Sequence, residues 1–311
     1  MTAPGAAPPR DHGGGLDAAR ARWGGDDWID LSTGIAPEPY PLPPLPADAW
    51  TRLPDRDAAA ALEAAARRLW RVPDGAGVLA APGASALIAR LPASMPPGPV
   101  DVPRPTYNEH AAALRAHGRT VGPGGAARVL VHPNNPDGRL WGAGDLAPFT
   151  VIDESFCDVA PEASLVAHAA RPGVVVLKSF GKFWGLAGLR LGFAIARPET
   201  LAPLAEALGP WPVSGPALAI GAAALSDGAW AEDARARLAR DAARLDALMA
   251  PHGRLVGGTT LFRLYETADA AALRDRLARA RVWSRTFPYS RSWLRLGLPP
   301  ARGWARLEAA L

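Results

Sequence analysis

The chain has 311 residues, of which 49% are hydrophobic and 21% charged, and its net charge is +4. This composition suits a soluble globular chain with one large or two modest cores. Arginines alternate with acidic residues in stretches such as 230–249, no segment reaches the roughly 18–20 apolar residues of a membrane helix, and Cys157 is the single cysteine. We therefore expect a cytoplasmic protein that has no disulfide framework and binds neither nucleic acid nor membrane.

The first 48 residues are rich in glycine and proline and contain one strand-like piece, WIDLSTGI (28–35). We expect them to form an N-terminal arm that belongs with a smaller domain. Residues 49–212 open with a helix at about 56–70, after which short apolar runs alternate with helical patterns. These runs are GVLAAPG, VDVP, ARVLVHP, FTVIDES, GVVVLKS and LRLGFAIA. Such runs suit strands buried on both faces, so we predict an α/β domain with a mainly parallel sheet between helices.

The pattern changes in residues 213–311. Two long helical stretches, 216–226 and 230–249, lead into the strand-like RLVGGTTLFRLYE. A helix at 268–280, the strand-like VWSRTF and WLRLGL, and a closing helix follow. We predict a smaller α+β domain here.

Lysine is rare in this chain: of 34 basic residues only Lys178 and Lys182 are lysines, and the rest are arginines. Only lysine can lose its proton near neutral pH and attack a carbonyl carbon. A compositional bias toward arginine cannot replace a lysine that acts as a reagent, so we expect one of the two to be chemical. Lys178 ends the strand VVVLK, where a charge that reaches solvent is the simpler expectation.

The residues around Lys182 carry a specific spacing. Ser179 stands three positions before it, Gly188 six after and Arg190 eight after. This resembles the fold-type I pyridoxal-phosphate enzymes of the class I and II aminotransferase family. The resemblance implies that Lys182 forms the Schiff base with pyridoxal 5'-phosphate and that Ser179 and Arg190 hold its phosphate. Gly181 departs from the family, because a phosphate-binding serine often stands there.

Two polar residues match further parts of the family site. Pyridoxal phosphate needs an acid that keeps its pyridine nitrogen protonated, and the resemblance gives this role to Asp153, 29 positions before Lys182. Asn135, in HPNNPDG, matches the asparagine that donates to the phenolate oxygen. Phe156 stands where many relatives have a tyrosine, so that hydroxyl donor is missing.

Three further segments complete the implied site. Gly83, Ala84 and Ser85 follow a strand and open a helix, and the N–H groups at such a helix start form an anion site. Tyr107 stands where the family stacks an aromatic ring on the cofactor, although a core tyrosine would fit the same pattern. Arg295, in the apolar run SWLRLGLP, matches the arginine that grips the substrate carboxylate.

The N-terminal sequence narrows the resemblance to one group within the family. The order HGG (12–14), then DLSTGI (30–35), is similar to the threonine-phosphate decarboxylases of cobalamin biosynthesis. This implies decarboxylation of L-threonine O-3-phosphate to (R)-1-aminopropan-2-yl phosphate. For the substrate phosphate we predict His12, Arg285 and the backbone around Gly34. His12 in a tail or Arg285 in a surface ion pair would be equally ordinary uses of these residues.

Two other activities stay open. Histidinol-phosphate aminotransferases share all of these cofactor-binding residues, so aminotransferase activity is the second hypothesis. A binding protein of this fold that has lost catalysis is the third. Ala36 and Leu53 depart from relatives, which have an asparagine beside the substrate and a tyrosine that reaches the neighbouring subunit's cofactor. The family implies a homodimer with active sites at the interface. We predict no metal site.

Overall fold

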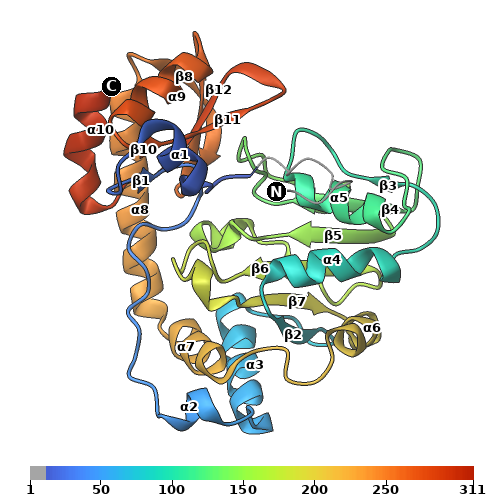
Figure 1. The fold of residues 1–311 in the computed structure, drawn as a ribbon. Coiled ribbons are helices and arrows are strands. Elements are labelled where there is room, and N and C mark those ends of the chain that lie inside the picture. The colour runs from blue at the N-terminus through green and yellow to red at the C-terminus, as the bar shows by residue number, and fades with distance from the viewer. Residues whose placement is uncertain (1–11) are drawn as a thin grey trace.

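The computed structural model describes residues 12–311, in which a six-stranded sheet forms the larger part of the molecule (Figure 1). Strand β7 runs antiparallel to both neighbours, and every other neighbouring pair runs parallel. The strands follow the order β2 (Gly77–Ala81), β7 (Gly192–Ala196), β6 (Val174–Ser179), β5 (Phe149–Asp153), β4 (Ala127–Val131) and β3 (Val100–Asp101). The predicted α/β fold with a mainly parallel sheet is confirmed.

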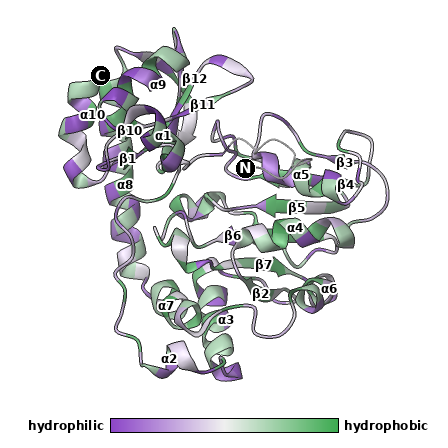
Figure 2. Ribbon diagram, in the orientation of Figure 1, coloured by the Kyte–Doolittle hydropathy of each residue, from purple (hydrophilic) through white to green (hydrophobic). Residues whose placement is uncertain are grey.

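Helices cover both faces of this sheet. One core joins strand residues such as Val151 and Val175 to three helices, α4 (Ala84–Ser94), α5 (Asn108–Ala116) and α6 (Pro198–Leu208). The opposite core joins Ile152 and Val176 to α3 (Arg56–Trp70) and α7 (Gly215–Ser226). Successive residues of a strand point to opposite faces, so strands buried on both sides read as continuous apolar runs. Figure 2 shows much of β5 and β7 in the green of hydrophobic residues.

A smaller antiparallel sheet has the order β11 (Arg285–Phe287), β12 (Ser290–Gly297), β9 (Phe262–Thr267) and β8 (Gly253–Thr259). Helices α9 (Ala270–Arg279) and α10 (Trp304–Ala310) lie beside it, and α8 (Gly228–Met249) runs from α7 toward it along one side of the molecule (Figure 1). The helix expected at 268–280 is two residues shorter at its start and one at its end. Asp269 caps it by accepting a hydrogen bond from the Ala272 N–H at 2.9 Å.

The N-terminal segment lies against the smaller sheet. Helix α1 (Leu16–Trp23) is followed by β1 (Ile29–Asp30), which pairs in parallel with β10 (Val282–Trp283). The strand expected over 28–35 is thus only two residues long, and its remainder is a loop. The chain then runs to α2 (Asp48–Thr51), which precedes α3. The boundaries at 48/49 and 212/213 stay a prediction.

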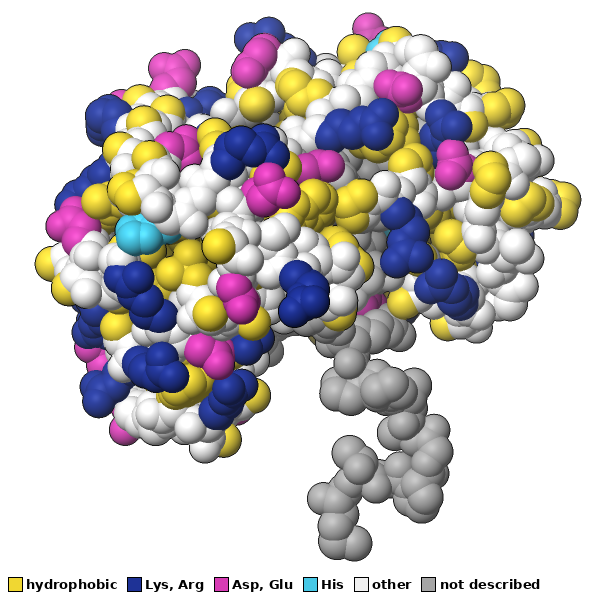
Figure 3. Space-filling view, turned by 90° about the horizontal axis from the view of Figure 1, so that it is seen from above, with side chains coloured by type: hydrophobic (Ala, Val, Ile, Leu, Met, Phe, Trp, Pro, Cys, Tyr) yellow, Lys and Arg dark blue, Asp and Glu magenta, His cyan; other side chains and the backbone are white. Residues whose placement is uncertain are grey.

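Six short 3₁₀ helices complete the secondary structure of the described residues: Ala143–Asp145, Cys157–Val159, Pro161–Ala163, Val166–His168, Ala187–Leu189 and Ala301–Gly303. Within residues 12–311 no helix is both long and apolar enough to cross a membrane. On the face seen in Figure 3, basic side chains are scattered among acidic ones. That distribution is unlike the continuous basic stripe of a nucleic-acid surface.

Candidate active site

Two connected cavities lie where the larger sheet meets the smaller one. The first, of about 130 Å³, opens at the carboxyl ends of β5 and β6, and the second, of about 500 Å³, extends toward β11 and β12. Four residues line both cavities: Tyr107, Asn135, Phe156 and Lys182. The first cavity brings together the predicted cofactor residues Ala84, Ser85, Tyr107, Asn135, Asp153, Ser179, Lys182 and Arg190. The second collects the predicted substrate residues His12, Gly34, Arg285 and Arg295.

Lys182 lies in the loop between β6 and β7, at the junction of the two cavities. Burial lowers the pKa of its ammonium group to about 8, and the positive charges of Arg295 and Arg190 add to this against the opposing effect of Asp153. Its Nζ atom is 5.4 Å from the centre of the Phe156 ring. An amine with this pKa is partly neutral, and therefore nucleophilic, near neutral pH.

Asp153 is buried at the carboxyl end of β5. Its Oδ2 atom lies 2.7 Å from His110 Nε2, and its Oδ1 accepts from Ser155 N–H at 3.0 Å and from the Ser155 hydroxyl at 2.5 Å. Burial raises the pKa of this carboxyl, but the hydrogen bonds and the charge of His110 outweigh burial and lower it. The carboxylate is thus kept ionised, as an acid partner of a pyridinium nitrogen must be.

The sequence reading missed His110. It lies on α5, four residues before Leu114, and both are buried against the sheet face to which Asp153 points. The spacing of a histidine and a leucine on one helix face was the available signal. Only the register of α5 over β5 shows which strand residue the histidine meets.

The turn before α4 is shaped to receive an anion. Gly83 has a φ of +84°, a conformation that favours glycine, and a Cβ there would lie 2.6 Å from Nη2 of Arg190. A Cβ on Gly192 would lie 2.3 Å from the Ala84 nitrogen. The first amides of a helix have no partner within it, so they and the Arg190 guanidinium face one space, which Ser179 also borders. This arrangement fits the phosphate of the cofactor that the resemblance implies.

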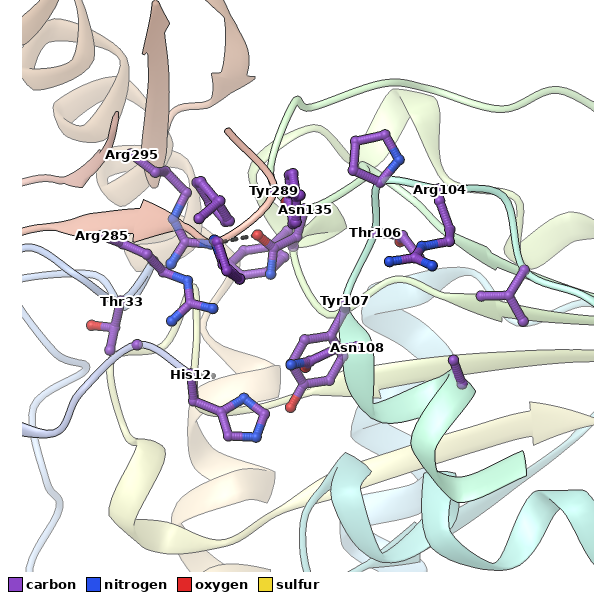
Figure 4. A pocket seen from close by; sticks show the side chains of 18 of the residues that line it. His12, Thr33, Arg104, Thr106, Tyr107, Asn108, Asn135, Arg285, Tyr289 and Arg295 are labelled. Atoms are coloured by element: carbon purple, nitrogen blue, oxygen red, sulfur yellow. Dashed lines mark hydrogen bonds between the residues drawn. The ribbon is translucent and has the colours of Figure 1, made fainter. Parts of the chain in front are cut away.

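Arg285 and Arg295 come together through strand pairing. They are direct partners across the antiparallel pair β11–β12, so both side chains lie on one face of the smaller sheet (Figure 4). Arg295 is 4% exposed, donates to the Ser32 carbonyl at 2.6 Å and donates to Oδ1 of Asn135. Its positive charge therefore stands at the inner end of the larger cavity, beside Asn135.

Segments far apart in the sequence form one wall of the larger cavity. Gly14 N–H donates to the Ser32 hydroxyl at 2.7 Å, and a Cβ on Gly13 would lie 2.3 Å from the Ser32 carbonyl oxygen. His12 Nε2 is 2.9 Å from Oε1 of Glu109 on α5. The HGG segment therefore rests on the STG segment, and this contact places His12 beside the cavity (Figure 4).

Gly34 and Gly181 are small for steric reasons. A Cβ on Gly34 would lie 2.7 Å from Cε1 of Phe156, and one on Gly181 would lie 2.9 Å from the Cα atom of Ala187. The departure at Gly181 thus reflects a backbone contact that leaves little room for a serine side chain. Of the other departures, Ala36 is buried and its N–H donates to the Lys182 carbonyl at 2.9 Å, whereas Leu53 is exposed.

The expectation that Lys178 reaches solvent is wrong. Its side chain is buried, with Nζ 2.7 Å from Glu154 Oε2 and 3.3 Å from Asp158 Oδ1. The indole N–H groups of Trp70 and Trp184 donate to the Asp158 carboxylate at 3.0 and 3.2 Å. Lys178 follows Val176 on the α3 face, and Glu154 follows Ile152 there, so this ion pair lies behind the sheet from the cofactor cavity.

Comparisons with known proteins agree with this architecture. The model of aminotransferases of class I and II matches residues 127–310. A threonine-phosphate decarboxylase of Pseudomonas aeruginosa is 42% identical over 330 residues, which cover 97% of each chain. Histidinol-phosphate aminotransferase from Sinorhizobium meliloti, solved with pyridoxal-5'-phosphate, superposes with a TM-score of 0.81 at 19% identity over 96% of this chain and 93% of that one. L-threonine-O-3-phosphate decarboxylase from Porphyromonas gingivalis superposes with a TM-score of 0.73 at 19% identity, over 90% of this chain and 97% of that one.

The two solved structures carry different activities on one fold, so they bear on the fold alone. The family model, by contrast, matches more than half of the chain, and the Pseudomonas relative spans nearly all of it. Both agree with the resemblance drawn from Lys182 and its neighbours. The chain belongs to the class I and II aminotransferase family.

Proposed function

We propose that the protein is a pyridoxal-phosphate-dependent threonine-phosphate decarboxylase. It converts L-threonine O-3-phosphate to (R)-1-aminopropan-2-yl phosphate and carbon dioxide, a step of cobalamin biosynthesis, in the cytoplasm. The observation that carries this proposal is the likeness to a threonine-phosphate decarboxylase along nearly the whole chain. The site adds a cavity whose charged lining residues, within the described part of the chain, are all basic, as a ligand with a carboxylate and a phosphate requires.

The residues that line the smaller cavity would each bind a different part of the cofactor. Gly83, Ser179 and Arg190 would hold the cofactor phosphate at one end of this cavity, and the Asp153 carboxylate would keep the pyridine nitrogen protonated at the other. Bound pyridoxal phosphate supplies a conjugated ring that accepts the electron pair released when a bond to the substrate Cα breaks. Oδ1 of Asn135 accepts a hydrogen bond from Arg295, so the amide nitrogen of Asn135 would be the group that donates to the ring oxygen.

The substrate is held at two anionic ends. Arg295 binds the carboxylate, and Arg285 with His12 binds the phosphate. Two anchors restrict rotation about Cα, and this restriction would decide which bond to Cα breaks. For decarboxylation that bond joins Cα to the carboxylate carbon. Carbon dioxide would leave without the bonding pair, and Lys182 Nζ, which lies at the junction of the two cavities, would deliver the proton to Cα.

The test uses protein purified with its cofactor. An absorbance band of the imine that borohydride or Lys182→Ala removes, together with carbon dioxide release from L-threonine O-3-phosphate, supports the proposal. If histidinol phosphate instead converts the cofactor to its amine form without carbon dioxide release, the protein is an aminotransferase. If the band is present but neither substrate reacts, the protein is a binding protein of this fold.

We further propose a homodimer that forms through the apolar surface around α2. The exposed fractions there are 65% for Leu42, 71% for Trp50 and 64% for Leu53. Helix α2 is itself anchored, because a Cβ on Gly215 of α7 would lie only 2.4 Å from the Ala49 carbonyl oxygen. An exposed apolar surface on an anchored helix suits burial against a second subunit. Light scattering of Trp50→Glu/Leu53→Glu should report a monomer where the unchanged protein reports a dimer.

A further inference from the structure

Two arginines of the larger cavity have no part in the site described so far. Arg104 lies in the segment between β3 and α5, and Arg115 lies in the last turn of α5. Both side chains are exposed, and both line the cavity that also contains Lys182. Figure 4 shows Arg104 on the side of this cavity opposite Arg285.

The helix period of α5 explains how Arg115 reaches the cavity. Asn108, Ala111 and Arg115 are spaced by three and four residues, so they share one face of the helix, and all three line the cavity. His110 and Leu114, each one position before Ala111 and Arg115, lie about 100° further round the helix, on its buried face. The helix that holds Asp153 through His110 therefore presents Arg115 to the opening.

The charge of the larger cavity is of one sign. Its lining in residues 12–311 contains Arg104, Arg115, Arg285, Arg295 and Lys182, and it contains no aspartate or glutamate. Within the same described part of the chain, neither the Arg104 nor the Arg115 side chain makes a hydrogen bond or an ion pair. A concave site lined by one sign of charge raises the local concentration of ligands of the opposite sign.

We infer that Arg104 and Arg115, here the outer arginine pair, attract phosphate dianions to the opening of the active site without holding them during the reaction. This inference rests on the proposed function for its substrate, a phosphorylated amino acid. It also covers the cofactor, because pyridoxal phosphate carries the same dianion and the cofactor cavity joins the larger one through Tyr107, Asn135, Phe156 and Lys182.

The test compares Arg104→Ala/Arg115→Ala with the control Arg240→Ala/Arg276→Ala. The control removes the same charge from exposed positions on α8 and α9 that line neither described cavity. At an ionic strength of about 10 mM we expect the outer pair variant to lose about fivefold to tenfold in kcat/KM for L-threonine O-3-phosphate, with kcat within about twofold. At about 300 mM the loss should shrink below about twofold, because salt screens exposed charges. The control should stay within about twofold throughout.

A second readout separates this inference from the proposed function. The rate at which pyridoxal phosphate binds the apoprotein, followed by absorbance, should fall in the outer pair variant at low salt even if the unchanged protein releases no carbon dioxide. The inference is overturned if kcat/KM and the rate of pyridoxal phosphate binding are both unchanged in the outer pair variant. It is also overturned if the control variant loses as much in kcat/KM, or if the loss persists at high salt. Failure of the unchanged protein to release carbon dioxide overturns only the proposed function.

Discussion

Lys178→Met tests the buried ion pair behind the cofactor cavity. Methionine nearly matches lysine in length, so the substitution removes the charge while leaving most of the packing in place. It leaves the carboxylates of Glu154 and Asp158, 1% and 6% exposed, without the cation that lies 2.7 and 3.3 Å from them. Glu154 keeps donors from Ser164 and Leu165, and Asp158 keeps two indoles, so their hydrogen bonds persist and only the charge is uncompensated.

The expected cost is about 3–5 kcal/mol in the free energy of unfolding, the usual cost of removing one partner of a buried pair. The pH dependence has a definite sign. Burial lowers the pKa of Lys178, but the charges of Glu154 and Asp158 outweigh it and raise the pKa above the usual 10.5. The stabilisation by Lys178 is therefore fully present below that value and is lost as the pH rises above it.

Urea unfolding of the cofactor-loaded protein at pH 7.5 measures this cost. Lys178→Arg is the control, because it keeps the charge but forces a larger group between Trp70 and the carboxylates, for which overpacking costs about 1–3 kcal/mol. A Lys178→Met protein within about 1 kcal/mol of the unchanged one would refute the reasoning. So would an arginine variant less stable than the methionine variant, since charge would then matter less than shape.

Three further predictions concern the site itself. Because the neutral amine of Lys182 is the nucleophile and its pKa is about 8, the rate of imine formation by the apoprotein should rise with pH and level off above about 8.5; a rate still rising at pH 10 would contradict this. His110→Ala removes a donor that lowers the pKa of Asp153, so the acid limb of the pH profile of kcat/KM should move to higher pH. We expect kcat/KM to fall about tenfold at pH 6 and the loss to fade toward pH 8. An acid limb at unchanged pH would exclude this role of His110. Gly34→Ala places a Cβ 2.7 Å from Phe156 and should cost about 1–3 kcal/mol in urea and raise KM; an unchanged KM would show that Phe156 yields.

Much of the fold could be read from the sequence because its signals are local. Each apolar run of residues 77–196 became a strand of the larger sheet, and the helix predicted at about 56–70 has those bounds. The parallel arrangement follows from the alternation of strands and helices. The pairing of β1 with β10 joins residues some 250 positions apart, and no local pattern announces it. The predicted strand over 28–35 is likewise longer than β1, because only Ile29 and Asp30 find partners on β10.

The site shows the same division. The scarcity of lysine indicated a reactive amine, because arginine cannot perform that chemistry, and the spacing of Ser179 and Arg190 around Lys182 carried the resemblance to the family. Only the tertiary structure decided what Lys178 does, because the face of β6 on which it lies and the carboxylates of β5 behind it depend on strand register. Register likewise set Arg285 opposite Arg295, and helix packing brought His110 to Asp153. Residue types alone indicate the chemistry of the site, whereas contacts between residues far apart in the sequence form only when the chain folds.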